Sequence, residues 1–165
     1  MTHKVWIVDI DDTLTVPYLQ KLTTDAEWEA MCENAQSNVI LILRLVAAMS
    51  PLDVIVICTG RKEKNRAVTE RWLRNKIYYQ HLFMRQDEDN RSAVEVKREL
   101  FQQIKEVYDG CAFALVDDDD DVRRMAWNEL GIFALHPTTA ALALVPFSEA
   151  PRVGIGQVQS YVVKQ

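Results

Sequence analysis

One stretch of the sequence decides the fold: Val5-Trp6-Ile7-Val8-Asp9-Ile10-Asp11-Asp12-Thr13. Its first four residues are apolar and mostly β-branched, and they lead directly into an Asp-x-Asp-x-Thr motif. A short apolar run of this kind is typical of a strand buried on both faces, as in a parallel sheet. We therefore expect a strand over residues 5–8 with an acidic loop at its carboxyl end.

Two more apolar runs end in the same abrupt way. Residues 54–58 lead into Thr59-Gly60-Arg61, and residues 112–116 lead into the five aspartates of 117–121. Ligands of open α/β sheets bind outside the carboxyl ends of the strands. We therefore expect these two polar clusters to meet the loop of 9–13 in one crevice.

Helical patterns separate the predicted strands. Thr24-x-x-Glu27 resembles a capping box, and Gly131 is placed to end the last long helix. The expected helices cover residues 24–31, 39–49, 64–76, 96–107 and 122–130, with a short strand at 132–135 and a possible short helix at 138–145. Alternating strands and helices predict an α/β fold: a doubly wound, mainly parallel sheet with flanking helices.

Composition is that of an ordinary globular chain. The 165 residues favour one domain, and the net charge of −5 does not favour a nucleic-acid coat or a membrane-surface protein. The three cysteines, Cys32, Cys58 and Cys111, are widely spaced, so we interpret them as small apolar residues. Without a signal-peptide pattern or a long apolar segment, we expect a cytoplasmic protein that does not enter membranes, of undetermined oligomeric state.

The acidic loop supplies the groups that phosphate-ester hydrolysis requires. Asp9 is placed to attack phosphorus and form an aspartyl-phosphate. Asp11, two residues on, is placed to protonate the leaving oxygen and later to deprotonate water. Thr13 is expected to order the loop through its hydroxyl. These residues predict a phosphomonoesterase.

The later clusters supply the positive charge that a phosphoryl group needs. Thr59 offers a hydroxyl and the start of a helix, and Lys97 offers an ammonium group. Asp117 and Asp118 crowd more carboxylates into the crevice, and these cannot all stay ionised beside an anionic ester without a cation. Carboxylate oxygens suit Mg²⁺, so we expect Mg²⁺ as the cofactor.

The order of these motifs over residues 5–135 resembles the haloacid dehalogenase (HAD) phosphohydrolase superfamily. Within it, the sequence is most similar to the phosphatase domain of phage-type polynucleotide kinase/phosphatase. The stretches that carry this likeness are Thr59-Gly60-Arg61, Thr69-Glu70-Arg71-Trp72-Leu73, Leu82-Phe83-Met84-Arg85, Arg91, the block from 96 to 101, and Trp127. No GxxxxGK[S/T] phosphate loop is present, so we expect a phosphatase without a kinase.

The resemblance implies a HAD-like Rossmannoid sheet with a small cap or none, and a phosphatase domain at 1–136 followed by an extension at 137–165. It implies Mg²⁺ binding by Asp9, by the backbone carbonyl of Asp11, and by Asp117, Asp118 or both. Substrate contacts are expected from Thr13, Gly60, Arg61 and Arg91. The run of five aspartates departs from the usual Asp-Asp-Arg, so Asp118 with Asp119 is the alternative metal pair.

The substrate is expected to be a polynucleotide 3′-phosphate end, because a small cap leaves room for a bulky ester. A nucleoside monophosphate phosphatase and a catalytically inactive binding module are the alternatives. Residues 61–76 hold seven Lys or Arg against two Glu, which indicates either a strip for a nucleic-acid backbone or an ordinary solvated helix face. Trp28 and Trp72 occupy apolar helix positions and are interpreted as core residues.

Overall fold

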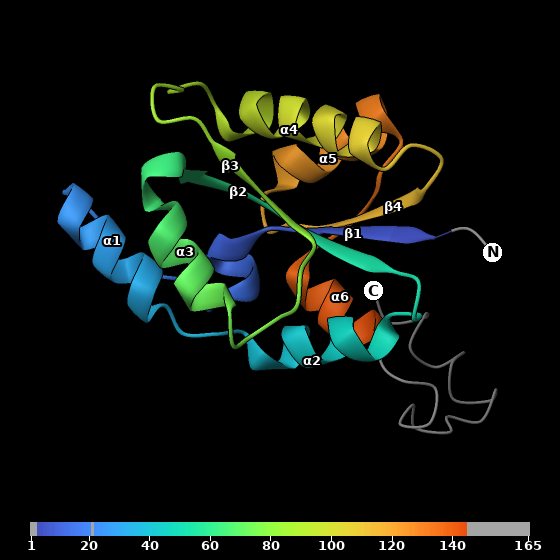
Figure 1. Ribbon diagram of the computed structural model, residues 1–165, viewed down its shortest axis with the longest axis horizontal. Helices are drawn as coiled ribbons and strands as arrows, with labels where there is room; N and C mark the ends of the chain where they lie inside the picture. The colour runs from blue at the N-terminus through green and yellow to red at the C-terminus, as the bar shows by residue number, and fades with distance from the viewer. Residues whose placement is uncertain (1–2, 21, 145–165) are drawn as a thin grey trace, which may run out of the picture.

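A five-stranded parallel sheet forms the centre of the protein, with strand order β3-β2-β1-β4-β5 (Figure 1). The computed structural model describes residues 3–20 and 22–144. The strands are β1 (Lys4–Val8), β2 (Val54–Lys62), β3 (His81–Arg85), β4 (Ala112–Val116) and β5 (Phe133–Leu135). The chain turns from one half of the sheet to the other between β1 and β4, where ligands of such sheets bind.

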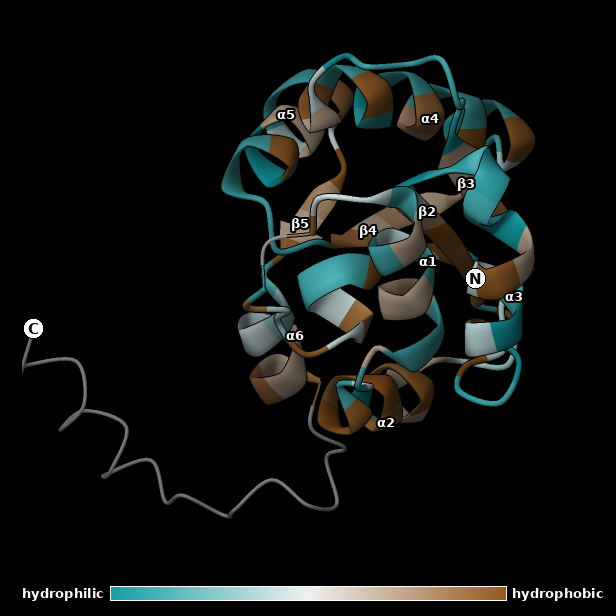
Figure 2. Cartoon of the chain, turned by 90° about the vertical axis from the view of Figure 1, so that its left-hand side faces the viewer, coloured by the Kyte–Doolittle hydropathy of each residue, from teal (hydrophilic) through white to brown (hydrophobic). Residues whose placement is uncertain are grey.

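Helices cover both faces of this sheet (Figures 1 and 2). One face carries α4 (Ala93–Val107) and α5 (Asp120–Leu130), and the other carries α2 (Val39–Ala48), α3 (Arg66–Leu73) and α6 (Pro137–Ala143). The remaining helix, α1 (Asp25–Asn34), packs against α3. The doubly wound α/β fold predicted from the sequence is confirmed.

The central strand β1 explains why its sequence is apolar throughout. Val5 and Ile7 belong to the core beneath α4 and α5, whereas Trp6 and Val8 belong to the core on the opposite face. Neighbouring side chains of a strand point to opposite faces, so a strand covered on both sides needs apolar residues at every position. All four residues are buried.

Capping side chains set the helix starts, as expected at α1. Thr24 and Glu27 form a reciprocal capping box there, and Ser92 and Glu95 form a second one at α4. Such a cap typically contributes about 1 kcal/mol. At the end of α5, Gly131 takes a left-handed conformation with a φ of 66°, which glycine adopts without steric cost.

The structure differs from the sequence expectations in three places. Strand β2 continues to Lys62 rather than stopping before Thr59, and α3 begins only at Arg66 after a 3₁₀ turn. Strand β3 was not predicted, because five residues at a sheet edge carry little periodic signal. Trp28 is 43% exposed instead of lying in the core, whereas Trp72 is buried as expected.

The last described helix, α6, packs beside α2, and its Ala140 is fully buried in their common core. Residues 145–165 lie outside the described part of the chain, so the division into a domain at 1–136 and an extension at 137–165 stays a prediction. Among the described helices, none combines the length and the apolar character needed to cross a membrane.

Candidate active site

The loop after β1 is wound into one wide turn over Ile10–Leu14. Inside it, Asp12 has a left-handed backbone with a φ of 57°, a conformation that Asp tolerates better than most residues. Asn38, which caps α2, donates from Nδ2 to the carbonyl of Thr13 at 3.1 Å. The turn is therefore held from outside, and it presents Asp11 at the carboxyl end of the sheet.

Lys97 of α4 joins the ends of two neighbouring strands. Its Nζ lies 3.1 Å from Oδ1 of Asp9 and 2.7 Å from Oδ2 of Asp117. All three side chains are buried. Asp9 is further fixed because its N–H donates to the carbonyl of Val116 in β4 at 3.0 Å. The structure thus brings together Lys97 of α4 with Asp9 and Asp117, which directly follow β1 and β4 and are more than a hundred positions apart in the sequence.

This cluster holds more negative than positive charge. Burial raises the pKa of Asp9 well above its usual value, the Lys97 ammonium opposes that rise, and the Asp117 carboxylate adds to it. Burial disfavours the charged form of Lys97 too, but the two carboxylates prevail and raise the pKa of that ammonium. Burial and the nearby Asp117 raise the pKa of Asp118 as well. Three carboxyl groups therefore surround one ammonium.

A divalent cation fits this excess of carboxylates. Oxygens of Asp9, Asp117 and Asp118 all lie within 4.8 Å of one another. The hydroxyl of Thr13 donates to Oδ1 of Asp118 at 3.3 Å and orients that side chain. Asp119 instead accepts from two backbone N–H groups as the N-cap of α5. The geometry favours Asp117 with Asp118 over Asp118 with Asp119 as the acidic pair.

Arg61 binds the second aspartate of the motif. A register shift in the β2–β3 pairing between Thr59 and Lys62 displaces Arg61 from the regular ladder. Its Nε lies 3.0 Å and its Nη2 2.7 Å from the carboxylate oxygens of Asp11. Burial opposes the charge of Arg61, but the hydrogen bonds to Asp11 raise its pKa. The guanidinium therefore stays charged although it is buried.

Thr59 is fully buried beside this pair, and its Oγ1 accepts from the N–H of Arg61 at 3.2 Å. The expectation that a helix starts at Thr59 is wrong, because β2 continues and α3 begins seven residues later. Gly60 follows, and a Cβ placed on it would lie 3.8 Å from Nη2 of Arg85. Gly60 therefore lies next to Arg61 in the chain and next to Arg85 in space.

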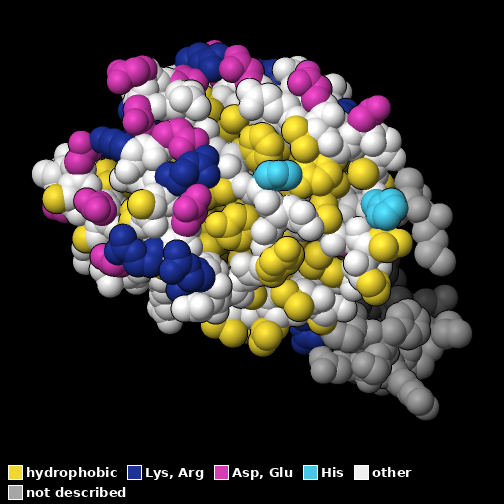
Figure 3. All heavy atoms as spheres, in the orientation of Figure 1, with side chains coloured by type: hydrophobic (Ala, Val, Ile, Leu, Met, Phe, Trp, Pro, Cys, Tyr) yellow, Lys and Arg dark blue, Asp and Glu magenta, His cyan; other side chains and the backbone are white. Residues whose placement is uncertain are grey.

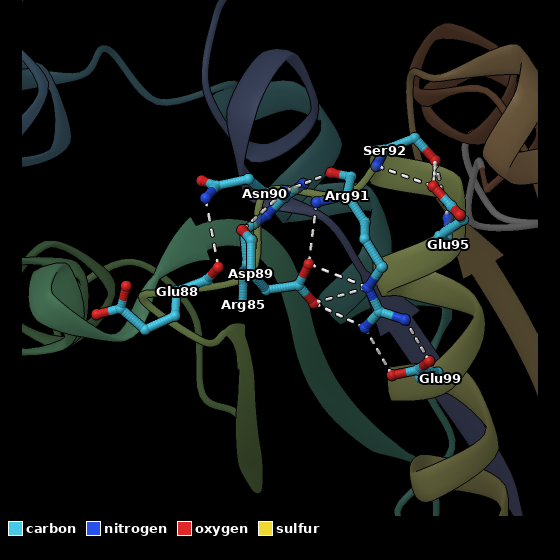
Figure 4. Close-up of polar contacts among 8 residues, drawn as sticks. All are labelled: Arg85, Glu88, Asp89, Asn90, Arg91, Ser92, Glu95 and Glu99. Carbon is cyan, nitrogen blue, oxygen red and sulfur yellow. Dashed lines mark hydrogen bonds and ion pairs between the residues drawn. The ribbon is translucent and has the colours of Figure 1, made fainter.

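The structure does not bring Arg91 to the Lys97 cluster (Figure 4). Its guanidinium donates to Asp89 from Nε and Nη2, and to Glu99 from Nη1 and Nη2 at 2.5 and 2.8 Å. Arg91 thereby ties the loop after β3 to α4. Its role as a substrate ligand remains a prediction.

Three features were not anticipated from the sequence. The pairing of Arg61 with Asp11 depends on a strand irregularity that leaves no clear sequence signal. Arg85 was noted within a family-like stretch, but no role was assigned to it. The exposure of Trp28 follows from how α1 packs on α3 through Met31, Cys32 and Val68.

The chain was compared with known proteins. Residues 3–138 match the family model described as "Polynucleotide kinase PNKP phosphatase domain". Among solved structures, the chain is similar to a component of the Pnkp1/Rnl/Hen1 RNA repair complex, with 26% identity and a TM-score of 0.69, over 82% of this chain and 42% of that one. A second structure of a Pnkp1/Rnl/Hen1 complex gives 26% identity and a TM-score of 0.68, over 82% of this chain and 46% of that one.

The chain thus spans less than half the length of these two solved relatives. The comparison with curated protein sequences found no significant match. The family match covers all five strands, the helices α1 to α5, and the site from Asp9 to Asp118 with Arg61 and Lys97 between them. The chain therefore belongs to the HAD-type family of polynucleotide kinase phosphatase domains and is a hydrolase of the phosphatase class.

Proposed function

We propose that this chain is a Mg²⁺-dependent phosphomonoesterase that acts through an aspartyl-phosphate on Asp9 and removes 3′-phosphates from polynucleotide ends. The observation that carries the proposal is the Lys97 ammonium held between Asp9 and Asp117, with an oxygen of Asp118 within 4.8 Å of both carboxylates. A nucleophile, a cation and an acidic pair therefore share one crevice.

The metal would be held by Asp9, Asp117 and Asp118, with the backbone carbonyl of Asp11 as a further ligand. Bound there, Mg²⁺ supplies positive charge for the phosphoryl oxygens and reduces their repulsion by Asp9. Lys97 contributes positive charge from the chain itself, and its position between two carboxylates keeps it protonated.

In the first half-reaction, a carboxylate oxygen of Asp9 attacks phosphorus. The new O–P bond forms as the bond from phosphorus to the ester oxygen breaks, and Asp11 gives its proton to that leaving oxygen. In the second half, water attacks phosphorus and gives a proton to Asp11, while the bond from phosphorus to the Asp9 oxygen breaks and frees the carboxylate and inorganic phosphate. The sum is one ester and one water converted into an alcohol and inorganic phosphate.

Asp11 must leave Arg61 to act as the acid. Both carboxylate oxygens of Asp11 accept hydrogen bonds from Arg61, so the side chain is turned to the guanidinium and not free to reach a leaving oxygen. An incoming phosphate competes for the same guanidinium, because Arg binds phosphate and carboxylate through the same planar donors. Binding of the phosphate to Arg61 would thus release Asp11 for its role.

The polynucleotide end is favoured by the family and by an open site. The family is that of polynucleotide kinase phosphatase domains, and the solved relatives belong to an RNA repair complex. Between the motif loop and β2 the described residues form only α1 and α2, and these pack against α3 and against α6 with the sheet. Neither helix forms a separate cap domain over the site, and an uncapped site can admit the end of a nucleic-acid strand.

The decisive experiment measures phosphate release by wild type, Asp9→Asn and Asp11→Asn. The substrates are a 3′-phosphorylated oligonucleotide, its 5′-phosphorylated counterpart, nucleoside 3′- and 5′-monophosphates, and p-nitrophenyl phosphate, each with Mg²⁺ and with EDTA. We expect the highest kcat/KM on the 3′-phosphorylated oligonucleotide, no turnover in EDTA, and a loss of about 10³-fold or more in Asp9→Asn.

Other outcomes would redirect the proposal. A preference for free nucleotides would indicate a nucleoside monophosphate phosphatase. If no ester were hydrolysed, the chain would be an inactive binding module. Wild-type turnover by Asp9→Asn would exclude the covalent mechanism. Asp120→Asn is the matched control, since Asp120 is exposed and pairs with Arg123 on α5.

A further inference from the structure

We propose that a second anion-binding subsite lies next to the phosphate site and takes the internucleotide phosphate that precedes the terminal phosphate of a strand. This inference rests on the proposed function and extends it. The subsite is a pocket of about 290 Å³. Its lining residues are four basic ones, one acid and three others: Arg61, Lys62, Lys64, Arg85, Asp25, Trp28, Gly60 and Asn65.

The pocket adjoins the site because they share the backbone of Gly60 and Arg61. Arg61 turns its guanidinium toward Asp11, whereas Gly60 faces Nη2 of Arg85. A ligand that places its terminal phosphate near Arg61 therefore has its next group within the pocket. The absence of a side chain at Gly60 keeps the approach to Arg85 open.

Arg85 forms no close ion pair with a carboxylate among the described residues, although its positive charge, after the hydrogen bonds from Arg91, helps to lower the pKa of the nearby Asp89. Its Nη1 donates to two backbone carbonyls, those of Arg91 at 2.7 Å and Asp89 at 3.4 Å. Neither Nη2 nor the buried Nε has a hydrogen-bond partner among the described residues. A guanidinium has five donors, so Arg85 retains the capacity to bind an anion.

The two lysines of the pocket are also available. Nζ of Lys62 donates to the carbonyl of Asp87 at 2.7 Å and to Oδ1 of Asn90 at 3.1 Å, and both acceptors are neutral. Nζ of Lys64 pairs with Asp25, whose side chain is 84% exposed. Exposed pairs of this kind are weak and exchange readily with another anion.

Two arginines of α3 within the basic strip of 61–76 are engaged by carboxylates. Arg66 pairs with Glu63 and Glu70, and Arg71 pairs with Glu33. In Figure 3, Lys and Arg side chains on the left of the molecule, over the region of α1 and α3, are mixed with Asp and Glu. Within the described residues, Lys62 at the start of the strip and Arg85 on β3 are therefore not ion-paired, whereas the two arginines of α3 are.

Trp28 supplies a surface for a base at the edge of the same pocket. It also lines a neighbouring cavity of about 610 Å³ that includes Asp11 and Asp12. The indole thus borders two cavities, one of which reaches the motif residues Asp11 and Asp12 and the other Arg61. Exposed aromatic rings beside a basic groove bind single strands by stacking on their bases. A phosphodiester followed by a base would contact the basic side chains of the pocket with its phosphate and the Trp28 ring with its base.

The test compares two dinucleotides with a 3′-phosphate, one with a natural phosphodiester and one with an uncharged methylphosphonate linkage. The readout is the ratio of kcat/KM for the charged over the neutral substrate. We expect wild type to prefer the charged dinucleotide about tenfold, as for one charge-assisted hydrogen-bonded contact. In Arg85→Gln the ratio should fall to near one.

Matched variants keep the test informative. Lys62→Gln should lower the same ratio and serves if Arg85→Gln does not fold. Trp28→Ala should raise KM for the charged dinucleotide several-fold, and Trp28→Phe should restore most of it. Arg98→Gln is the control, because Arg98 pairs with Glu129 between α4 and α5, and it should keep the wild-type ratio.

The failures of the two proposals are distinguishable. If wild type releases phosphate from p-nitrophenyl phosphate but its ratio is near one, the subsite is wrong and the proposed function stands. An unchanged ratio in both Arg85→Gln and Lys62→Gln also excludes the subsite. If wild type with Mg²⁺ hydrolyses none of the esters, the proposed function itself fails.

Discussion

The guanidinium of Arg61 donates hydrogen bonds to the carboxylate of Asp11 from two nitrogens, Nε at 3.0 Å and Nη2 at 2.7 Å. The arginine side chain is 1% exposed and that of the aspartate 34%, so the pair joins a buried cation to a partly exposed carboxylate. Nη1 of Arg61 also donates to the hydroxyl of Thr69, and the guanidinium lies 5.9 Å from the centre of the Trp72 ring. These contacts fix the orientation of the Arg61 guanidinium.

Arg61→Lys should therefore reduce activity although it keeps the charge. A lysine cannot bind phosphate or carboxylate through two parallel donors. We expect a loss of about 10²-fold in kcat/KM on a 3′-phosphorylated oligonucleotide, in the range found for one transition-state donor. Arg66→Lys, on the exposed start of α3, should stay within about twofold, as expected for a surface ion pair. Equal losses in the two variants would refute the role of Arg61.

Lys97→Met should destabilise the fold as well as abolish activity. It leaves Asp9 and Asp117 buried without their common ammonium, and removing one partner of a buried ion pair typically costs about 3–5 kcal/mol. Chemical denaturation measures this cost. Adding Asp9→Asn should recover part of the stability, since it removes one of the carboxylates. If the double variant were no more stable than Lys97→Met, electrostatic repulsion would not be the cause.

Mg²⁺ should raise the melting temperature of the wild-type protein. A cation that binds only the folded state at about 100 times its Kd adds about 2.7 kcal/mol. Asp118→Asn should reduce this shift, because Asp118 supplies one of the three clustered oxygens. In the wild-type protein Asp121 pairs with Arg124 on the exposed side of α5. Asp121→Asn should therefore keep the full shift in melting temperature. A shift that is equal in both variants would place the metal elsewhere.

Acid should weaken the start of α1 through Glu27. Hydrogen bonds from the N–H groups of Thr23 and Thr24 lower the pKa of Glu27 from 4.5 to about 2. A group whose pKa is lower in the folded state stabilises the fold above its unfolded pKa, and this contribution is lost as the pH falls from about 4.5 through 2. Thermal unfolding across that window should therefore depend less on pH in Glu27→Gln than in wild type.

Glu106→Gln is the comparison for that measurement, because Glu106 is exposed on α4 and lies outside any capping box. It should follow the wild-type pH dependence. An identical profile for Glu27→Gln and wild type would mean that the capping box does not contribute to stability in this range.

The sequence by itself determined the strands β1, β2, β4 and β5 of the sheet and the meeting of Asp9 with Asp117. A strand covered on both faces must be apolar at every position, so its run of side chains is visible locally, and parallel strands bring their carboxyl ends to one edge. The capping box at Thr24 and the stop at Gly131 were likewise predictable, because they depend on residues a few positions apart.

Only the tertiary structure decided which partners the charged side chains bind. Arg61 pairs with Asp11 because of the irregularity in β2, and Arg91 turns to Glu99 on α4. Arg85 and Trp28 line one pocket although they lie on β3 and α1. Each outcome is a competition between partners that are distant in the sequence. Local patterns do not encode that competition, because the positions of the partners exist only once the layers have packed.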